Sequence, residues 1–68
     1  MQLTVRLERE EDGRWFGQVS ELPGVFAYGA TRDDAAKAAQ ILAMRVVADK
    51  LEEREIDAQM IVISFESE

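Results

Sequence analysis

The chain contains no cysteine and no histidine. Disulfide bonds therefore cannot stabilise it, and a zinc site built from cysteine and histidine ligands is excluded. The usual pairs of a nucleophile and a base are missing as well, because Ser20 and Ser64 have no visible base partner. We therefore expect a protein that is not an enzyme and that holds no cofactor.

Basic residues are also scarce, since 8 lysines and arginines stand against 14 aspartates and glutamates, for a net charge of −6. Proteins that bind DNA or RNA need a basic surface to contact the phosphates, so we expect no direct DNA binding by this chain. The acidic balance is instead compatible with a basic protein partner.

Long apolar runs are missing too. The most apolar region spans residues 35–48, but Lys37, Gln40 and Arg45 interrupt it, and it is too short to cross a membrane. Met1 leads directly into an alternating pattern instead of a basic segment and an apolar run, so no signal peptide is visible. We expect a cytoplasmic protein with no membrane partner.

The length of 68 residues is enough for one domain, which we expect to span residues 1–68. A domain of this size buries only about 60% of the surface that its unfolded chain exposes. The hydrophobic fraction of 47% is ordinary for a folded domain. Because neither disulfides nor zinc can add stability, we expect an efficient core or self-association, as a homodimer or a higher oligomer.

Alternation of apolar and polar residues over 2–8 and 14–20 predicts two strands. Asp12-Gly13 between them predicts a hairpin turn, because glycine adopts a positive φ at little cost. Gly17 in the second strand allows a helix or another backbone to approach closely. The residues predicted on the inner face are Leu3, Val5, Leu7, Trp15, Gly17 and Val19.

The segment Leu-Pro-Gly at residues 22–24 predicts a type II turn, because proline sets one φ and glycine supplies the positive one. A short third strand follows over residues 25–29. Thr31 then caps a helix, since its hydroxyl can accept the backbone N–H of Asp34. Asp33 and Asp34 are favourable there, because the helix dipole is positive at this end.

Apolar residues at three- and four-residue spacing predict one amphipathic helix after Thr31. We place its core stripe at Ala35, Ala38, Ala39, Leu42 and Val46. A flank that widens the stripe, and leaves apolar surface for a second subunit, consists of Ala36, Ala43, Val47 and Leu51. Acidic residues in the segment 52–55 lie at the unfavourable end of the dipole, so we expect fraying there.

Residues 60–66 predict the last strand, with Ile61, Ile63 and Phe65 on one face, and Ile56 is expected to pack under the domain. The element order is β-β-β-α-β. Short connections make the first three strands an antiparallel meander, and a right-handed crossover places the fourth strand parallel to the third and beside the first. We predict an α+β fold, a mixed four-stranded sheet in the order 3-2-1-4 with one helix on one face.

The sheet face without a helix carries a predicted cluster of Phe16, Phe26 and Tyr28 near the third strand, which is an open edge. Single exposed aromatics are ordinary, but three together beside an open edge predict a partner-binding surface. A surface that stacks RNA bases needs lysines and arginines around the same aromatics, and only Arg6 and Arg14 are near.

Acidic residues are predicted to gather where the strand ends meet the helix start, namely Glu8, Glu10, Glu11, Asp12, Asp33, Asp34, Glu66 and Glu68. Carboxylates brought together can form a two-metal nuclease site, and the strand-helix-strand placement is reminiscent of the ribonuclease H fold. Most of these residues lie on loops or at the terminus, so solvated loops explain them better. We expect no metal.

Residues 12–25 read Asp-Gly-Arg-Trp-Phe-Gly-Gln-Val-Ser-Glu-Leu-Pro-Gly-Val, and Gly29, Thr31 and an alanine-rich helix follow. This pattern resembles the HicB-like antitoxin domain, which typically reads Asp-Gly, aromatic, small, aromatic, Pro-Asp-Leu-Pro-Gly-Cys and then Gly-Asp-Thr. The resemblance covers about residues 3–52. Val25 stands where the family frequently has cysteine.

The resemblance implies a partly degraded ribonuclease H-like fold without nuclease activity. It also implies an antitoxin of a toxin–antitoxin system, one that binds and blocks a small basic RNA-cleaving toxin of the HicA type. Full-length members often add a C-terminal DNA-binding domain, and because this chain stops after the fourth strand we expect a stand-alone form. Two alternatives stay open: a small homo-oligomeric regulatory or ligand-sensing subunit with no toxin partner, and a metal-dependent nuclease.

Overall fold

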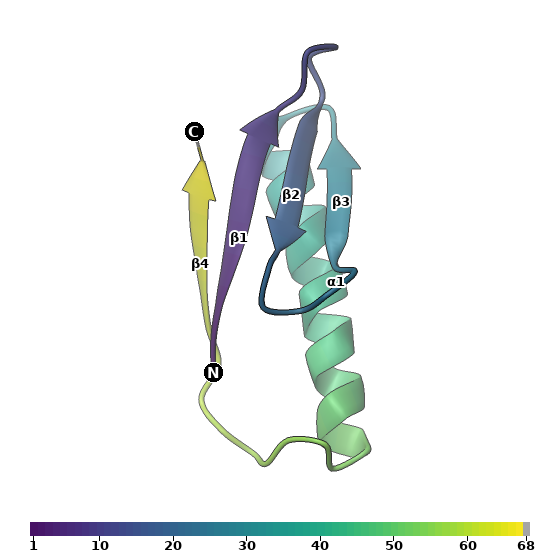
Figure 1. Ribbon diagram of the computed structural model, residues 1–68, viewed down its shortest axis with the longest axis vertical. Coiled ribbons are helices and arrows are strands. Elements are labelled where there is room, and N and C mark those ends of the chain that lie inside the picture. The colour runs from purple at the N-terminus through teal and green to yellow at the C-terminus, as the bar shows by residue number, and fades with distance from the viewer. Residues whose placement is uncertain (68) are drawn as a thin grey trace.

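The computed structural model describes residues 1–67 and contains one four-stranded sheet and one helix (Figure 1). Along the chain the elements are β1 (Gln2–Arg9), β2 (Trp15–Val19), β3 (Phe26–Gly29), α1 (Arg32–Glu52) and β4 (Val62–Ser67). The strand order is β3-β2-β1-β4, with antiparallel pairs β1–β2 and β2–β3 and a parallel pair β1–β4. The predicted α+β class, element order and sheet order are therefore confirmed.

Two tight turns join the first three strands where the sequence predicts them. Between β1 and β2, Gly13 has a φ of 92°, and its N–H donates to the carbonyl of Glu10 at 3.0 Å. Between β2 and β3, Gly24 has a φ of 84°, and the N–H of Val25 donates to the carbonyl of Leu22 at 3.1 Å. Glycine adopts both conformations without steric cost, so these turns follow from local sequence.

The start of α1 is capped by a side chain, as predicted. The hydroxyl of Thr31 accepts the backbone N–H of Asp34 at 3.1 Å. Asp33 and Asp34 lie in the first turn, where the helix dipole favours negative charge. The helix has 21 residues, and within residues 1–67 no helix is both long enough and apolar enough to cross a membrane.

The end of α1 is closed by backbone hydrogen bonds, which corrects the expectation of fraying over residues 52–55. The N–H of Arg54 donates to the carbonyl of Leu51 at 3.2 Å, and the N–H of Glu55 donates to the carbonyl of Lys50 at 2.9 Å. These are the two bonds of a Schellman motif, in which Arg54 takes the place usually held by glycine. The ammonium of Lys50 lies 3.2 Å from the carboxylate of Glu55, so a cation offsets the acidic residues at this end.

The core lies between α1 and one face of the sheet. Its buried residues are Leu3, Val5, Leu7, Val19, Leu22, Val25, Ala35, Ala36, Ala39, Ala43 and Val47. Partly buried residues that pack against it include Trp15, Ala27, Ile56 and Ile63. The predicted inner faces of the first two strands and the predicted packing of Ile56 are therefore confirmed.

The buried face of α1 is rotated from the predicted stripe. Leu42 is 36% exposed, and Ala38 and Val46 are only partly buried. Ala36 and Ala43, predicted as a flank for a second subunit together with Val47, instead belong to the core of the chain itself. The prediction of these three residues as an intersubunit surface was therefore wrong.

Two glycines explain why small residues form the buried face of α1. A Cβ on Gly17 would lie 3.1 Å from the carbonyl oxygen of Ala35 and 3.2 Å from the Cβ of Ala39. A Cβ on Gly29 would collide with the backbone nitrogen of Ala35 and lie 2.8 Å from the Cβ of Asp34. The helix sits so close to the strands that alanine fits between them, and larger side chains turn to the flanks.

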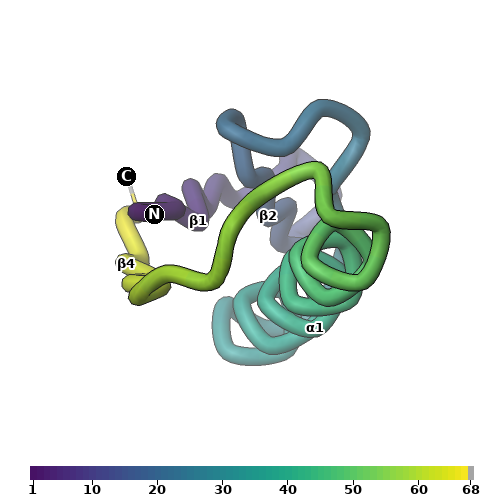
Figure 2. Tube along the Cα trace, turned by 90° about the horizontal axis from the view of Figure 1, so that it is seen from below, coloured from purple at the N-terminus to yellow at the C-terminus, as the bar shows by residue number. Residues whose placement is uncertain are grey.

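Strand β4 lies beside β1 but outside the cover of α1. Figure 2 shows the helix beneath β2, with β4 at the far edge of the sheet. In β4, Phe65 is 40% exposed, and Ile61 just before the strand is 37% exposed. Of the three residues predicted to share one face of this strand, only Ile63 packs against the core, so the inner face of β4 has an apolar surface without a helix over it.

Candidate functional site

Three aromatic side chains lie together on the sheet face that α1 leaves open. Phe16 in β2 is the register partner of Tyr28 in β3, and Phe26 lies diagonally across from Phe16. The ring centroids of Phe16 and Tyr28 are 5.1 Å apart, and those of Phe16 and Phe26 are 5.8 Å apart. The structure thus brings together the three residues that the sequence predicted to cluster, which we name the aromatic patch.

The hydrogen-bond pattern of the β2–β3 pair explains why these rings touch. The N–H of Val19 donates to the carbonyl of Val25 at 3.0 Å. Because such bonds alternate along an antiparallel pair, Phe16 and Tyr28 form a non-hydrogen-bonded pair, in which side chains come closest. Phe26 is 49% exposed and Tyr28 is 46% exposed, so both keep a large apolar surface available for a partner.

The same alternation turns backbone groups of β3 toward the edge of the sheet. The N–H and C=O groups of Phe26 and Tyr28 point away from β2, and within residues 1–67 no further strand lies beyond β3. A strand edge of this kind can pair with an extended segment of another protein. Exposed rings and free backbone groups therefore come from the same two residues.

One arginine lies at the rim of the aromatic patch. The guanidinium carbon of Arg14 is 4.6 Å from the centroid of the Tyr28 ring. Its Nε donates to the carboxylate of Asp12 at 2.8 Å, and its backbone N–H donates to the same carboxylate at 3.1 Å. The hydrogen bond from the backbone N–H of Arg14 lowers the pKa of Asp12 below its usual value, and the hydrogen bond from the Arg14 side chain adds a smaller effect in the same direction. The sequence identified Arg14 only as a nearby cation, not as a partner of Tyr28.

The middle of the open face is polar. Arg6 in β1 is the register partner of Gln18 in β2 and of Glu66 in β4, and its guanidinium lies 3.6 Å from the Glu66 carboxylate. Thr4 and Ser64 pair on the next row of the same face. The aromatic patch next to the β3 edge is therefore separated by polar residues from Val62 of β4, which is 47% exposed on the same face.

Within residues 1–67, the acidic side chains at one end of the molecule are spread apart. Among residues 1–67, no group of three or more acidic side chains lies close enough to hold a metal ion. Asp12 and Glu66 are each engaged by an arginine instead, while Glu68 lies outside the described residues. The strand ends converge as predicted, but this geometry does not support a two-metal nuclease.

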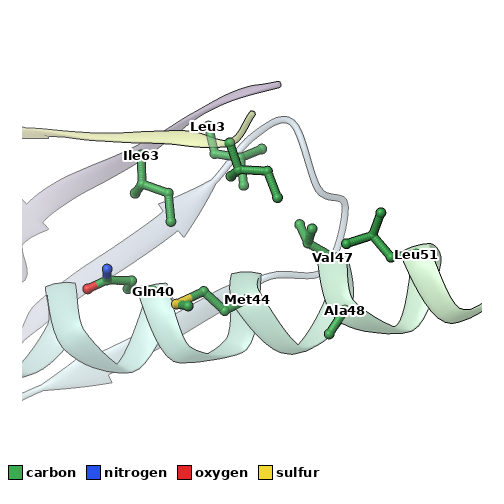
Figure 3. Close-up of a pocket in the computed structure, with 8 residues that line it drawn as sticks. Leu3, Gln40, Met44, Val47, Ala48, Leu51 and Ile63 are labelled. Carbon is green, nitrogen blue, oxygen red and sulfur yellow. The ribbon is translucent and has the colours of Figure 1, made fainter. Parts of the chain in front are cut away.

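An apolar groove between α1 and β4 is a feature that the sequence did not predict (Figure 3). It has a volume of about 300 Å³. Six of the residues that line it are Leu3, Ile61 and Ile63 from the sheet side and Met44, Val47 and Leu51 from the helix. The signal for it was present in the spacing of Met44 and Leu51, which repeat at seven residues along one side of the helix.

The described residues offer an aromatic patch, an open strand edge and an apolar groove for contact. Comparison of the chain with known protein families, curated proteins and solved structures finds no match. Function is therefore inferred from the aromatic patch, the β3 edge and the sequence resemblance.

Proposed function

We propose that this chain is an antitoxin-like protein-binding module of the HicB type that neutralises a small basic RNA-cleaving toxin of the HicA type. The observation that carries the proposal is the position of the aromatic patch beside the open edge of β3. Main-chain pairing along an edge supplies affinity, and adjacent side chains supply specificity. Aromatic rings of this kind are enriched among the residues that dominate binding energy.

Charge supports a basic partner. The chain carries a net charge of −6, and Glu8 is the register partner of Phe16 on the open face. The hairpin next to the aromatic patch forms a shallow hollow lined by Glu10, Glu11, Asp12 and Arg14. Acidic groups around an apolar surface attract a basic protein during encounter and disfavour acidic ones.

Four of the residues behind the family resemblance lie around β3. Gly24 and Val25 form the turn that leads into the strand. Gly29 ends the strand against α1, and Thr31 caps the helix that follows. The motif thus positions the edge that carries Phe26 and Tyr28, which fits a blocking role that needs a rigid contact surface and no chemistry of its own.

A second candidate function is a homo-oligomeric regulatory or ligand-sensing subunit without a toxin partner. The observation that favours it is the apolar groove between α1 and β4, which lies away from the aromatic patch. In that case the groove, not the β3 edge, would carry the function.

The test is co-purification of the tagged chain with a short basic protein encoded in a neighbouring reading frame. We expect a complex at micromolar concentration and inhibition of RNA cleavage by that protein. Phe26→Asp is expected to weaken the complex at least tenfold. The matched control is Met60→Asp, because Met60 is 81% exposed and lies outside the aromatic patch. Absence of a complex, or equal binding by both variants, would refute the proposal.

A further inference from the structure

The groove between α1 and β4 marks a gap in the layer that covers the sheet. A helix is about 10–12 Å wide with its side chains, and neighbouring strands are about 4.8 Å apart. One helix therefore covers about two of the four strands. In this chain α1 packs mainly against β2 and β3. The inward side chains of β1 are buried, but the inner face of β4 is left with a partial cover.

Large apolar side chains are exposed on both walls of the groove. Met44 is 56% exposed and Leu51 is 36% exposed on the helix side, and Ile61 is 37% exposed on the sheet side. Ile41, next to Met44 on the outer side of α1, is 44% exposed. Exposed apolar patches on a chain this small mark interaction sites.

We propose that a second copy of this chain fills the groove, so that the two α1 helices lie side by side and parallel in one layer between two sheets. A two-fold axis that runs along the helices, between them, places each helix over the inner face of β4 of the other copy. Each sheet is then covered by two helices, its own and that of its partner. This interface is independent of the aromatic patch, which stays accessible on the outer face of each sheet.

The spacing of residues on α1 fits such a seam. Ile41, Met44, Ala48 and Leu51 follow the three- and four-residue spacing of helices that pack side by side. Met44 points into the groove in Figure 3, and in the proposed dimer it meets Met44 of the second copy. Ile41 lies on the side of α1 that points away from the sheet of its own chain, so in the dimer it faces β4 of the second copy.

Charge and size also favour a second copy as the occupant. The residues that line the groove carry no charge. A separate hollow beside Phe65, which shares Gln40 with the groove, has two cations, Arg32 and Lys37, against one acid, Asp33. The acidic excess of the chain therefore lies elsewhere, and two acidic copies repel each other least here. A standard interface needs about 800 Å² from each partner, about one sixth of the 4791 Å² surface of this chain.

The absence of cysteine allows a direct test by single-cysteine crosslinking. Under mild oxidation, Met44→Cys is expected to form a covalent dimer in high yield, because both copies place this residue at the axis. Leu42→Cys is the matched control, since Leu42 is exposed on the same helix but does not line the groove. It is expected to stay monomeric on a denaturing gel.

Light scattering of the unmodified chain at micromolar to submillimolar concentration is expected to give the mass of two chains. Met44→Glu is expected to give the mass of one chain with an unchanged circular dichroism spectrum, whereas Phe26→Asp stays dimeric. A monomer at every concentration, a dimer lost only in Phe26→Asp, or a monomer whose groove takes up an apolar dye would overturn the proposal. Loss of toxin binding by Phe26→Asp does not bear on it, so the two proposals fail separately.

Discussion

Gly29, the last residue of β3, lies so close to Ala35 in the first turn of α1 that a Cβ on the glycine would collide with the backbone nitrogen of the alanine. Only two residues separate Gly29 from Arg32, where the helix begins. The glycine therefore lets the chain fold directly back onto the strand that carries the aromatic patch.

We expect Gly29→Ala to lower the free energy of unfolding by about 2–3 kcal/mol, because the new methyl group meets backbone atoms that cannot move aside. Gly17→Ala is expected to cost about 1 kcal/mol, because its closest neighbours would lie at 3.1–3.2 Å and need to shift only slightly. Urea denaturation followed by circular dichroism measures both values. Equal losses in the two variants would contradict the assigned contact.

Arg54 closes the helix with a φ of 59°, a conformation that favours glycine. We expect Arg54→Gly to raise the free energy of unfolding by about 1 kcal/mol, and the melting temperature by about 4–8 °C. Glu53→Gly is the control, because Glu53 has a φ of −82° and gains nothing from glycine. If the control stabilises the chain as much, strain at Arg54 is not the cause.

Thr31 caps α1 through its hydroxyl, which accepts the N–H of Asp34 at 3.1 Å. Thr31→Ala is expected to cost about 1 kcal/mol of stability, because it leaves a helix N–H without a partner. Thr31→Ser keeps the hydroxyl and is expected to remain close to the natural chain. Thermal unfolding of the three proteins distinguishes loss of the cap from loss of the threonine methyl group.

The pKa of Asp12 lies below its usual value of 3.8 because of hydrogen bonds from Arg14. A lowered pKa in the folded state means that this carboxylate stabilises the fold above about pH 4, and that its contribution is lost as the pH falls through the folded-state value. In a carbon-detected NMR titration, Arg14→Gln is expected to raise the pKa only in part, because the backbone N–H at position 14 remains. A full return to 3.8 would show that the side chain alone sets the shift.

Local features of the fold follow directly from sequence. The turns at Gly13 and Gly24 and the helix cap at Thr31 are each closed by a hydrogen bond between residues three positions apart in the chain. The outward direction of Phe26 and Tyr28 follows from alternation along one strand. Each of these depends on neighbours in the chain, which is why periodicity and turn residues predict them.

Which residues of α1 are buried, and whether a helix covers the inner face of β4, depend on distances between elements and were predicted less well. Apolar spacing indicates an amphipathic helix but does not say which of several apolar residues points inward. Ala43 is buried while the larger Leu42 is exposed. The close approach of Ala35 and Ala39 to the two glycines of the sheet sets which face of the helix is buried, and Ala43 lies one turn further on that face.

By itself, the sequence determined the strands, the turns, the helix cap and the membership of the aromatic patch. Only the tertiary structure decided that α1 lies over β2 and β3, which leaves an apolar groove beside β4. The physical reason is that the lateral position of a helix depends on how closely it can approach each strand. Two glycines set that approach on one side of the sheet, and no pattern within the helix reveals it.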